Sequence, residues 1–127
     1  MKVLVTAGPT REKIDAVRFL TNRSTGKMGY ALAEAARDAG HEVTLVSGPV
    51  ALAVPRGITL VPVESAAEMA EAVKERAPQM ALVIMCAAVA DYRPKLVVAG
   101  KMKKREGDLV LELEPVSYPH LRAHETS

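Results

Sequence analysis

The 127-residue sequence is poor in cysteine, in aromatic residues and in long uncharged runs, and each shortage excludes a class of protein. A single cysteine, Cys86, excludes an internal disulfide, which fits a reducing compartment. With no tryptophan and only 3% aromatic residues, the core must be built from aliphatic side chains and methionine. The longest run without a charge, residues 77–90, is too short to span a bilayer, and the N-terminus shows no signal-peptide pattern. We therefore expect a soluble cytoplasmic protein with no membrane partner.

Net charge, histidine content and length further limit the kind of protein this can be. The net charge of +2 is too small to indicate nucleic acid as a partner. There are only three histidines, and two of them lie in the last eight residues, so we predict no metal site built from side chains. A hydrophobic content of 49% is enough for a packed core, and the length fits one domain or part of one.

What the sequence does contain is a series of short apolar runs that alternate with helical patterns. Four runs are typical of buried parallel strands: residues 2–7, 42–47, 58–63 and 80–87. The last is the most apolar, and we predict that it is central in the sheet. Residues 108–113 alternate more weakly and could form an edge strand.

Two helices are expected between these strands. The first has an apolar period and a glycine stop at Gly40; the positions are Met28, Leu32, Ala35, Ala36 and Ala39. The second opens with a capping box, Ser65 and Glu68, and its predicted buried residues are Ala66, Met69, Ala70, Val73 and Ala77.

This order predicts an α/β fold of Rossmann-like type, a three-layer parallel sheet with right-handed crossovers. In such folds ligands bind beyond the carboxyl ends of the strands. Segments 8–29, 48–57 and 88–104 should therefore surround one crevice. Residues 115–127 follow no helix or strand period. We predict a domain portion over residues 1–114, truncated at its C-terminus, and an unrelated or disordered tail (a possible sequencing or cloning artefact) over residues 115–127.

The long loop after the first strand carries the candidate site, but two familiar phosphate motifs fail there. The dinucleotide fingerprint needs glycine where Thr10 stands and an acid where Ser47 and Gly48 stand. A Walker A loop needs Ser or Thr after Gly26-Lys27, and Met28 follows instead.

The segment 24–29, Ser-Thr-Gly-Lys-Met-Gly, still opens a helix, and the free N–H groups of a helix N-terminus favour an anion. The same loop carries Asn22 and three arginines, Arg11, Arg18 and Arg23, which suit an anionic substrate. The plainer alternative is a solvated charged loop, with Lys27 as an ordinary surface lysine.

Five blocks of the sequence, in order and with matching spacing, resemble the phosphopantothenoylcysteine synthetase family: residues 6–12, 15–29, 43–50, 86–94 and 101–104. In bacteria this domain is usually the C-terminal half of a bifunctional coenzyme A biosynthesis flavoprotein. The resemblance implies a ligase that joins 4′-phosphopantothenate to L-cysteine through an amide, after activation as an acyl-nucleotide. It further implies CTP as the nucleotide (ATP is used in other branches), Mg²⁺ carried by the nucleotide, a homodimer at full length, and no flavin in this portion.

The resemblance also implies roles for individual residues. Asn22, Arg18 and Lys101 match catalytic positions, Asn22 on the acyl-nucleotide and Lys101 on the phosphates. The positions that match nucleotide-binding residues are Gly8, Ser24, Thr25, Gly26, Lys27, Met28, Gly29, Cys86, Ala87, Ala88, Asp91 and Lys101.

The resemblance ends after Glu114, where the family continues with an Asn-Pro-Asp-Ile type segment. We therefore expect the chain by itself to be inactive. Two other hypotheses stay open from the residues alone: a nicotinamide-dependent oxidoreductase domain of Rossmann type, and a non-catalytic oligomerisation module.

Overall fold

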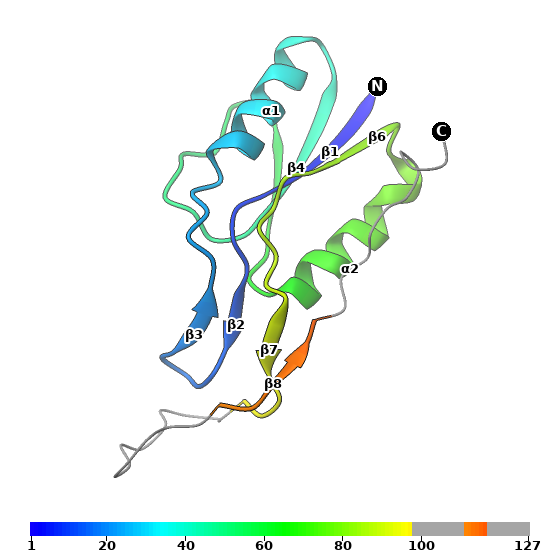
Figure 1. Ribbon diagram of the computed structural model, residues 1–127. Helices are drawn as coiled ribbons and strands as arrows, with labels where there is room; N and C mark the ends of the chain where they lie inside the picture. Colours follow the sequence, from blue (N-terminus) through cyan, green and yellow to red (C-terminus); the bar gives the residue numbers. More distant parts are fainter. Residues whose placement is uncertain (98–110, 117–127) are drawn as a thin grey trace.

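A four-stranded parallel sheet organises the protein (Figure 1). The computed structural model describes residues 1–97 and 111–116. Within these ranges the sheet order is β5-β4-β1-β6, formed by β1 (Lys2–Ala7), β4 (Glu42–Ser47), β5 (Thr59–Pro62) and β6 (Leu82–Met85). The predicted first two strands are confirmed residue for residue, and the other two are shorter than predicted.

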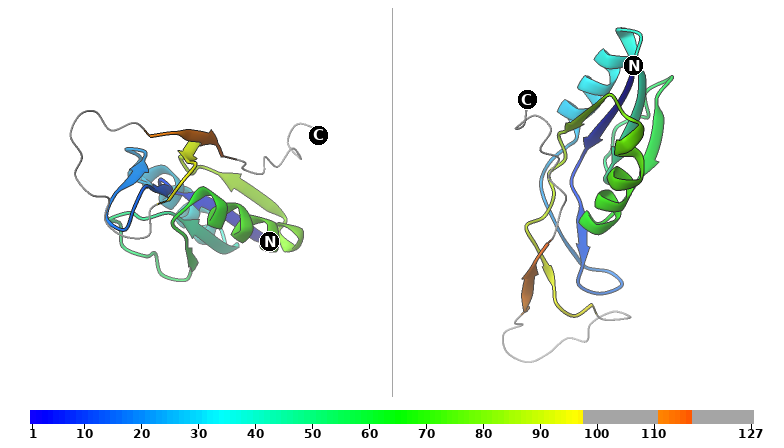
Figure 2. Two further views of the ribbon diagram at one scale, coloured as in Figure 1. Left: turned by 90° about the horizontal axis from the view of Figure 1, so that it is seen from below. Right: turned by 90° about the vertical axis from the view of Figure 1, so that its right-hand side faces the viewer.

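Two helices cover opposite faces of this sheet and complete the three layers of the predicted α/β fold (Figure 2). They are α1 (Lys27–Asp38) and α2 (Ala66–Arg76), the second followed by a short 3₁₀ turn, η1 (Ala77–Gln79). Because side chains alternate along a strand, β1 serves both faces. Val3 and Val5 pack with Tyr30 and Ala33 of α1, whereas Leu4 packs with Met69 of α2.

Two antiparallel hairpins extend beyond the carboxyl end of the sheet (Figure 1). The first, β2 (Arg11–Lys13) and β3 (Phe19–Thr21), lies within the loop between β1 and α1. The second pairs β7 (Tyr92–Pro94) with β8 (Leu113–Pro115), and β2 lies against β7. The sequence predicted only a long loop at residues 8–29, so the first hairpin was missed.

The buried face of α1 differs from the prediction. Met28 is 72% exposed and Leu32 37%, and the buried residues of the helix are instead Gly29, Tyr30 and Ala33. The reason is a close approach at the first turn. A Cβ at Gly29 would lie 2.5 Å from the Cβ of Ala7, so the glycine seats the helix directly on β1 and fixes its rotation. For α2, the capping box and the predicted residues 66, 69, 70 and 73 are confirmed as buried, while Ala77 is partly buried.

The prediction that the fourth apolar run is central is wrong for the sheet as described. β6 pairs only with β1 among residues 1–97 and 111–116, and Leu82 is 44% exposed. Its apolar character follows from contacts on both of its faces, since Ile84 packs toward α1 and Val83 toward α2.

The C-terminal predictions fall largely outside the described residues. The edge strand expected at residues 108–113 lies partly outside the described residues. The strand observed in this region, β8, begins at Leu113. The predicted boundary at residue 114 falls within β8, and residues 117–127 lie outside the described part. In that described part, neither helix has the length and apolar character needed to cross a membrane.

Replacement of Gly29 by alanine tests the seating of α1. The added Cβ meets Ala7 and the carbonyl oxygen of Thr6, the latter at 3.1 Å, so the helix must shift. We expect Gly29→Ala to lower the free energy of unfolding by about 1–3 kcal/mol in urea denaturation. Glu34→Ala, on the exposed side of the same helix, is the control and should change it by less than about 0.5 kcal/mol. Equal effects of the two variants would contradict this packing.

Candidate functional site

The carboxyl edge of the sheet forms a hollow beside the first turn of α1. It has a volume of about 520 Å³ and is lined by Arg11, Ser24, Thr25, Lys27 and the segment 49–52. Pockets for small ligands usually fall within roughly 300–1,000 Å³, so the hollow can hold a nucleotide-sized molecule. A second hollow adjoins it along residues 47–49 and 62–64, and Arg11 lines both. Three predicted site residues, Ser24, Thr25 and Lys27, therefore meet here.

Glycines bring three backbone segments together under this hollow. Gly8 and Gly26 have φ values of 79° and 80°, in the left-handed region that other residues rarely adopt. A Cβ on either would lie 2.8 Å from Cγ1 of Val50, and one on Gly48 would collide with the carbonyl oxygen of Pro9. The predicted Gly8 and Gly26 thus serve first to pack the β1 loop, the α1 N-terminus and the loop after β4 against each other.

The N-terminus of α1 is open. Its N-cap is Gly26, which has no side-chain cap, and the first turn contains no acidic residue. Weak contacts satisfy the N–H groups of Gly26 and Lys27, which donate to Ser24 Oγ (3.3 Å) and Thr25 Oγ1 (3.4 Å). The N–H groups in the first turn of a helix have no intrahelical acceptor, and those of Met28 and the buried Gly29 are among them. The helix dipole and Lys27 both favour an anion at this point.

The N-terminus of α2 lies at the same edge of the sheet, but its first turn is capped by side chains. Ser65 Oγ accepts from the N–H of Glu68 at 3.1 Å, and the Glu68 carboxylate accepts from the N–H of Glu64 at 3.0 Å. A third acceptor comes from far away in the sequence, because the buried Glu12 carboxylate of β2 accepts from the N–H of Ala66 at 3.0 Å. Two N–H groups of the first turn of α2 are therefore paired, Ala66 with the Glu12 carboxylate and Glu68 with Ser65 Oγ, while the Glu68 carboxylate binds Glu64 just before the helix.

Asn22 lies between the β3 strand and the α1 N-terminus. Its Oδ1 accepts a hydrogen bond from the N–H of Ser24 at 3.0 Å, which closes a tight local turn. Since the oxygen is used in this way, the Nδ2 group is the part of the exposed side chain that can donate to a ligand. This geometry suits the predicted contact with a carboxylate.

Arg18 is placed differently from Asn22. It lies at the tip of the β2–β3 hairpin, where its Nη1 donates to the buried carboxylate of Asp15 at 2.8 Å. The other oxygen of Asp15 accepts from the N–H groups of Val17 and Arg18, so one carboxylate forms the turn and holds the arginine. Arg18 does not line either hollow described above; Arg11 does, with its guanidinium 4.5 Å from the centre of the Phe19 ring.

The residues after β6 run beside the glycine loop. The N–H groups of Cys86, Ala87 and Ala88 all donate toward β1 and its loop, to Thr6 O, Thr6 Oγ1 and Gly8 O respectively. Cys86 is half-buried, and the predicted Asp91 is exposed just before β7. Met28 points away into solvent, and Lys101 lies outside the described residues.

Arg11 is the one polar residue lining this hollow to which the family resemblance gave no role. From the sequence it stood out only as one of three loop arginines. No alternation marked its strand, because residues 11–13 are all charged and residues 19–21 read Phe-Leu-Thr.

Three buried hydroxyl groups, those of Thr10, Tyr30 and Ser47, hold the loops in place. Thr10 is fully buried, its Oγ1 accepts from the N–H of Ala90 at 3.1 Å, and its carbonyl accepts from Thr21 Oγ1 at 2.9 Å. On the other side of the hollow, the Tyr30 hydroxyl donates to Ser47 Oγ, which donates to the carbonyl of Gly48 at 2.7 Å. Ser47 stands where a dinucleotide-binding domain has its acid, and here it supports the backbone instead.

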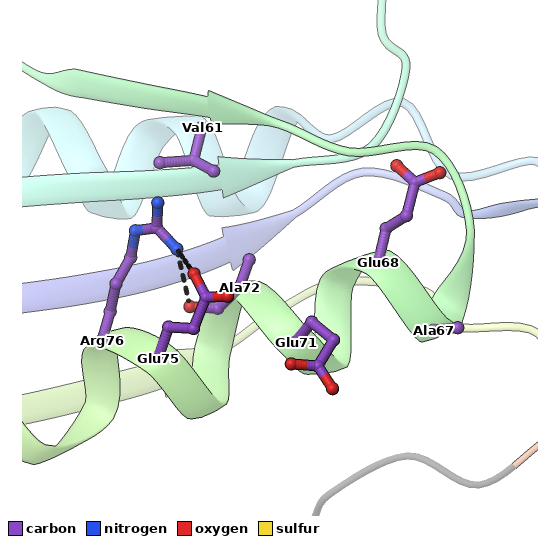
Figure 3. Close-up of a pocket in the computed structure, with 7 residues that line it drawn as sticks. All are labelled: Val61, Ala67, Glu68, Glu71, Ala72, Glu75 and Arg76. Carbon is purple, nitrogen blue, oxygen red and sulfur yellow. Dashed lines mark hydrogen bonds and ion pairs between the residues drawn. The ribbon is translucent and has the colours of Figure 1, made fainter.

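A third hollow lies between α2 and β5 and shares Glu68 with the second (Figure 3). Its polar lining is mostly glutamate, Glu68, Glu71 and Glu75, and Arg76 donates to Glu75 and to the carbonyl of Ala72. Carboxylates disfavour an anionic substrate, and none of the predicted site residues lies here. Among residues 1–97 and 111–116 no group of three or more His, Cys, Asp or Glu side chains is placed to hold a metal ion.

Comparison with known proteins identifies the family of this chain. The family model of the DNA/pantothenate metabolism flavoprotein C-terminal domain matches residues 1–117. The chain belongs to this family. The resemblance seen in the five sequence blocks is thereby confirmed, and so is the Rossmann-like fold.

Individual relatives carry names from coenzyme A biosynthesis. The bifunctional protein CoaBC of Bacillus subtilis is 58% identical over 113 residues, 88% of this chain and 28% of that protein. The crystal structure of a CoaBC C-terminal domain is 54% identical, with a TM-score of 0.79, over 91% of this chain and 54% of that one. A Cab2 mutant in complex with phosphopantothenate-cysteine has the same fold, at 18% identity and a TM-score of 0.78, over 91% of this chain and 56% of that one. The chain thus spans under a third of the bifunctional relative and about half of the matching domains.

Thr10→Val tests how firmly the family's loop is held against the segment after β6. Valine has the shape of threonine but cannot accept from the partly buried N–H of Ala90. We expect a loss of about 1–3 kcal/mol in the free energy of unfolding, measured by urea denaturation. Thr59→Val, at an exposed position in β5, is the isosteric control. An unchanged stability for Thr10→Val would show that the hydrogen bond contributes nothing.

Proposed function

We propose that this chain forms the nucleotide-binding half of a phosphopantothenate–cysteine ligase that uses CTP. One observation carries the proposal. The open, basic N-terminus of α1 lies directly beside Asn22, whose Oδ1 is tied to Ser24 while its Nδ2 stays available. A phosphate site thus adjoins a neutral donor for a carboxylate, which is the pair of functions that acyl-nucleotide formation needs.

The reaction joins two bond exchanges. An oxygen of the 4′-phosphopantothenate carboxylate attacks the α-phosphorus of CTP, the bond to the β-phosphate breaks, and pyrophosphate leaves. The amine of L-cysteine then attacks the carbonyl carbon of the acyl-cytidylate, CMP leaves, and the amine loses its extra proton as the amide forms. The protein contributes positioning and charge stabilisation to both steps.

Each residue has a role in this proposal. The N–H groups and side chains of the segment 24–29 bind the triphosphate, with Lys27 adding charge. The Nδ2 of Asn22 binds the carboxylate of phosphopantothenate and then the acyl oxygen, because an amide donates without titrating. Arg18, oriented by Asp15, binds an anionic part of the same substrate, and Lys101 stabilises the departing pyrophosphate. The segment 86–88 and Asp91 contact the base and ribose.

Magnesium fits this site through the nucleotide. The residues beside α1 are donors and cations, not carboxylates, and so offer Mg²⁺ few ligands of their own. We propose that the ion is bound mainly by the phosphates of CTP and neutralises part of their charge. We propose no flavin site in this portion of the protein.

A chimaera provides the test, because the chain covers only about half of the matching domain. In it, the matching segment of this chain replaces the 113 aligned residues of the Bacillus subtilis relative. We expect release of pyrophosphate that requires CTP, phosphopantothenate and Mg²⁺, and a ligated product with cysteine. Asn22→Ala should lower kcat by about 100-fold or more, the effect typical of loss of a transition-state donor.

Lys13→Gln, an exposed residue of β2, is the matched control and should leave kcat unchanged. Ligation that survives Asn22→Ala would contradict the assigned role. Binding of NADPH without binding of CTP would replace the ligase by the oxidoreductase alternative.

The 127-residue chain alone should show no turnover. Assayed at the concentration that gives activity in the chimaera, it should form no phosphopantothenoylcysteine detectable by mass spectrometry. Ligation by the chain alone would show that residues 1–127 hold a complete active site.

A further inference from the structure

The buried carboxylate of Glu12 is the polar group that the proposed mechanism leaves unexplained. Glu12 is 4% exposed and lies on β2, yet its Oε2 accepts from the N–H of Ala66, 54 residues away, at the start of α2. Burial of a carboxylate is unfavourable unless hydrogen bonds compensate it. Here the donor is a free N–H of a helix N-terminus, and the helix dipole adds to the attraction.

This hydrogen bond is one of a pair that joins the hairpin to the sheet. The N–H of the neighbouring residue, Arg11, donates to the carbonyl of Glu64 at 2.7 Å. β2 is thereby fastened at two successive residues to the segment that leads into α2. On its other edge β2 pairs with β3 from Arg11↔Thr21 to Lys13↔Phe19, and β3 leads directly into Asn22.

We propose that Glu12 is a positioning residue of the ligase site: by capping α2 it sets the place of the β2–β3 hairpin and hence of Asn22. The inference rests on the proposed function. The chain of contacts runs from Ala66 through Glu12 and its partner Leu20 on β3 to the Asn22–Ser24 turn. Glu12 touches no substrate in this account.

A second consequence concerns which of the two helix N-termini binds an anion. Both α1 and α2 begin at the carboxyl edge of the sheet, and each would otherwise attract a phosphate. Because the carboxylate of Glu12 occupies Ala66 N–H and Ser65 Oγ occupies Glu68 N–H, α2 repels an anion and α1 receives it. Loss of Glu12 therefore both loosens the hairpin and exposes a competing anion site.

The test compares Glu12→Ala, Glu12→Asp and Glu12→Gln. Glutamine keeps an acceptor oxygen at the same reach, whereas aspartate is one methylene shorter and alanine has no acceptor. In the chimaera we expect kcat to fall about tenfold or more for Ala and Asp, with KM for CTP changed less than about threefold, since a small misplacement lowers the rate more than binding. Glutamine should restore kcat to within about threefold of the parent.

Ser65→Ala is the matched control. It removes a hydrogen bond from the same helix terminus and lowers Tm, but leaves the contact between hairpin and helix in place. A merely structural role for Glu12 predicts that Ser65→Ala and Glu12→Ala lower kcat alike at matched folded fraction, as judged by circular dichroism. That result, or full kcat in Glu12→Ala, would overturn the inference.

The 127-residue chain gives a readout that needs no activity. In its ¹⁵N–¹H spectrum, Glu12→Ala should shift the amide signals of residues 21–24, while Ser65→Ala should shift only those of α2 and its N-terminal segment. If these signals respond and the parent chimaera lacks ligation, the proposed function fails and the positioning of Asn22 stands. If the signals of residues 21–24 do not move, the positioning role itself is wrong.

Discussion

The geometry of the site depends on which helix N-terminus has its N–H groups capped by side chains and which does not. α1 begins at a glycine with no side-chain cap, and the N–H of Lys27 is held only by a long contact to Thr25 Oγ1, whereas α2 is capped by a serine and by the Glu12 carboxylate. We propose that these weakly held donors of α1 bind an anion, with the positive end of the dipole favouring a phosphate over a neutral ligand. The place of that phosphate would then determine which neighbours act on the nucleotide.

Close backbone packing makes this terminus possible. Gly8 and Gly26 leave room for Val50, Gly48 leaves room for the carbonyl of Pro9, and Gly29 seats α1 on Ala7. Side chains at these positions would displace the helix from the sheet edge. The glycines of the 24–29 motif are therefore needed by the fold itself, before any contact with a ligand.

The sequence alone predicted the strands and helices that have a clear hydrophobic pattern or a strong N-terminal cap. β1 and β4 were predicted to the residue, and the Ser65–Glu68 box located α2. The face of α1 was not predictable from period alone, because the close approach at Gly29 rotates Met28 and Leu32 toward solvent. The β2–β3 hairpin was missed because its strands have three residues each and its turn is closed by a buried side chain, Asp15, and not by a glycine. The contact of Glu12 with Ala66 joins residues 54 apart and has no local signature.

The location of the nucleotide phosphates is the central claim, and amide chemical shifts test it most directly. Titration of the ¹⁵N-labelled chain with CTP and Mg²⁺ should shift the amide signals of residues 24–29, above all Met28 and Gly29, and leave those of Ala66 and Glu68 in place. Shifts confined to the start of α2, or no response at residues 24–29 at millimolar CTP, would contradict the account.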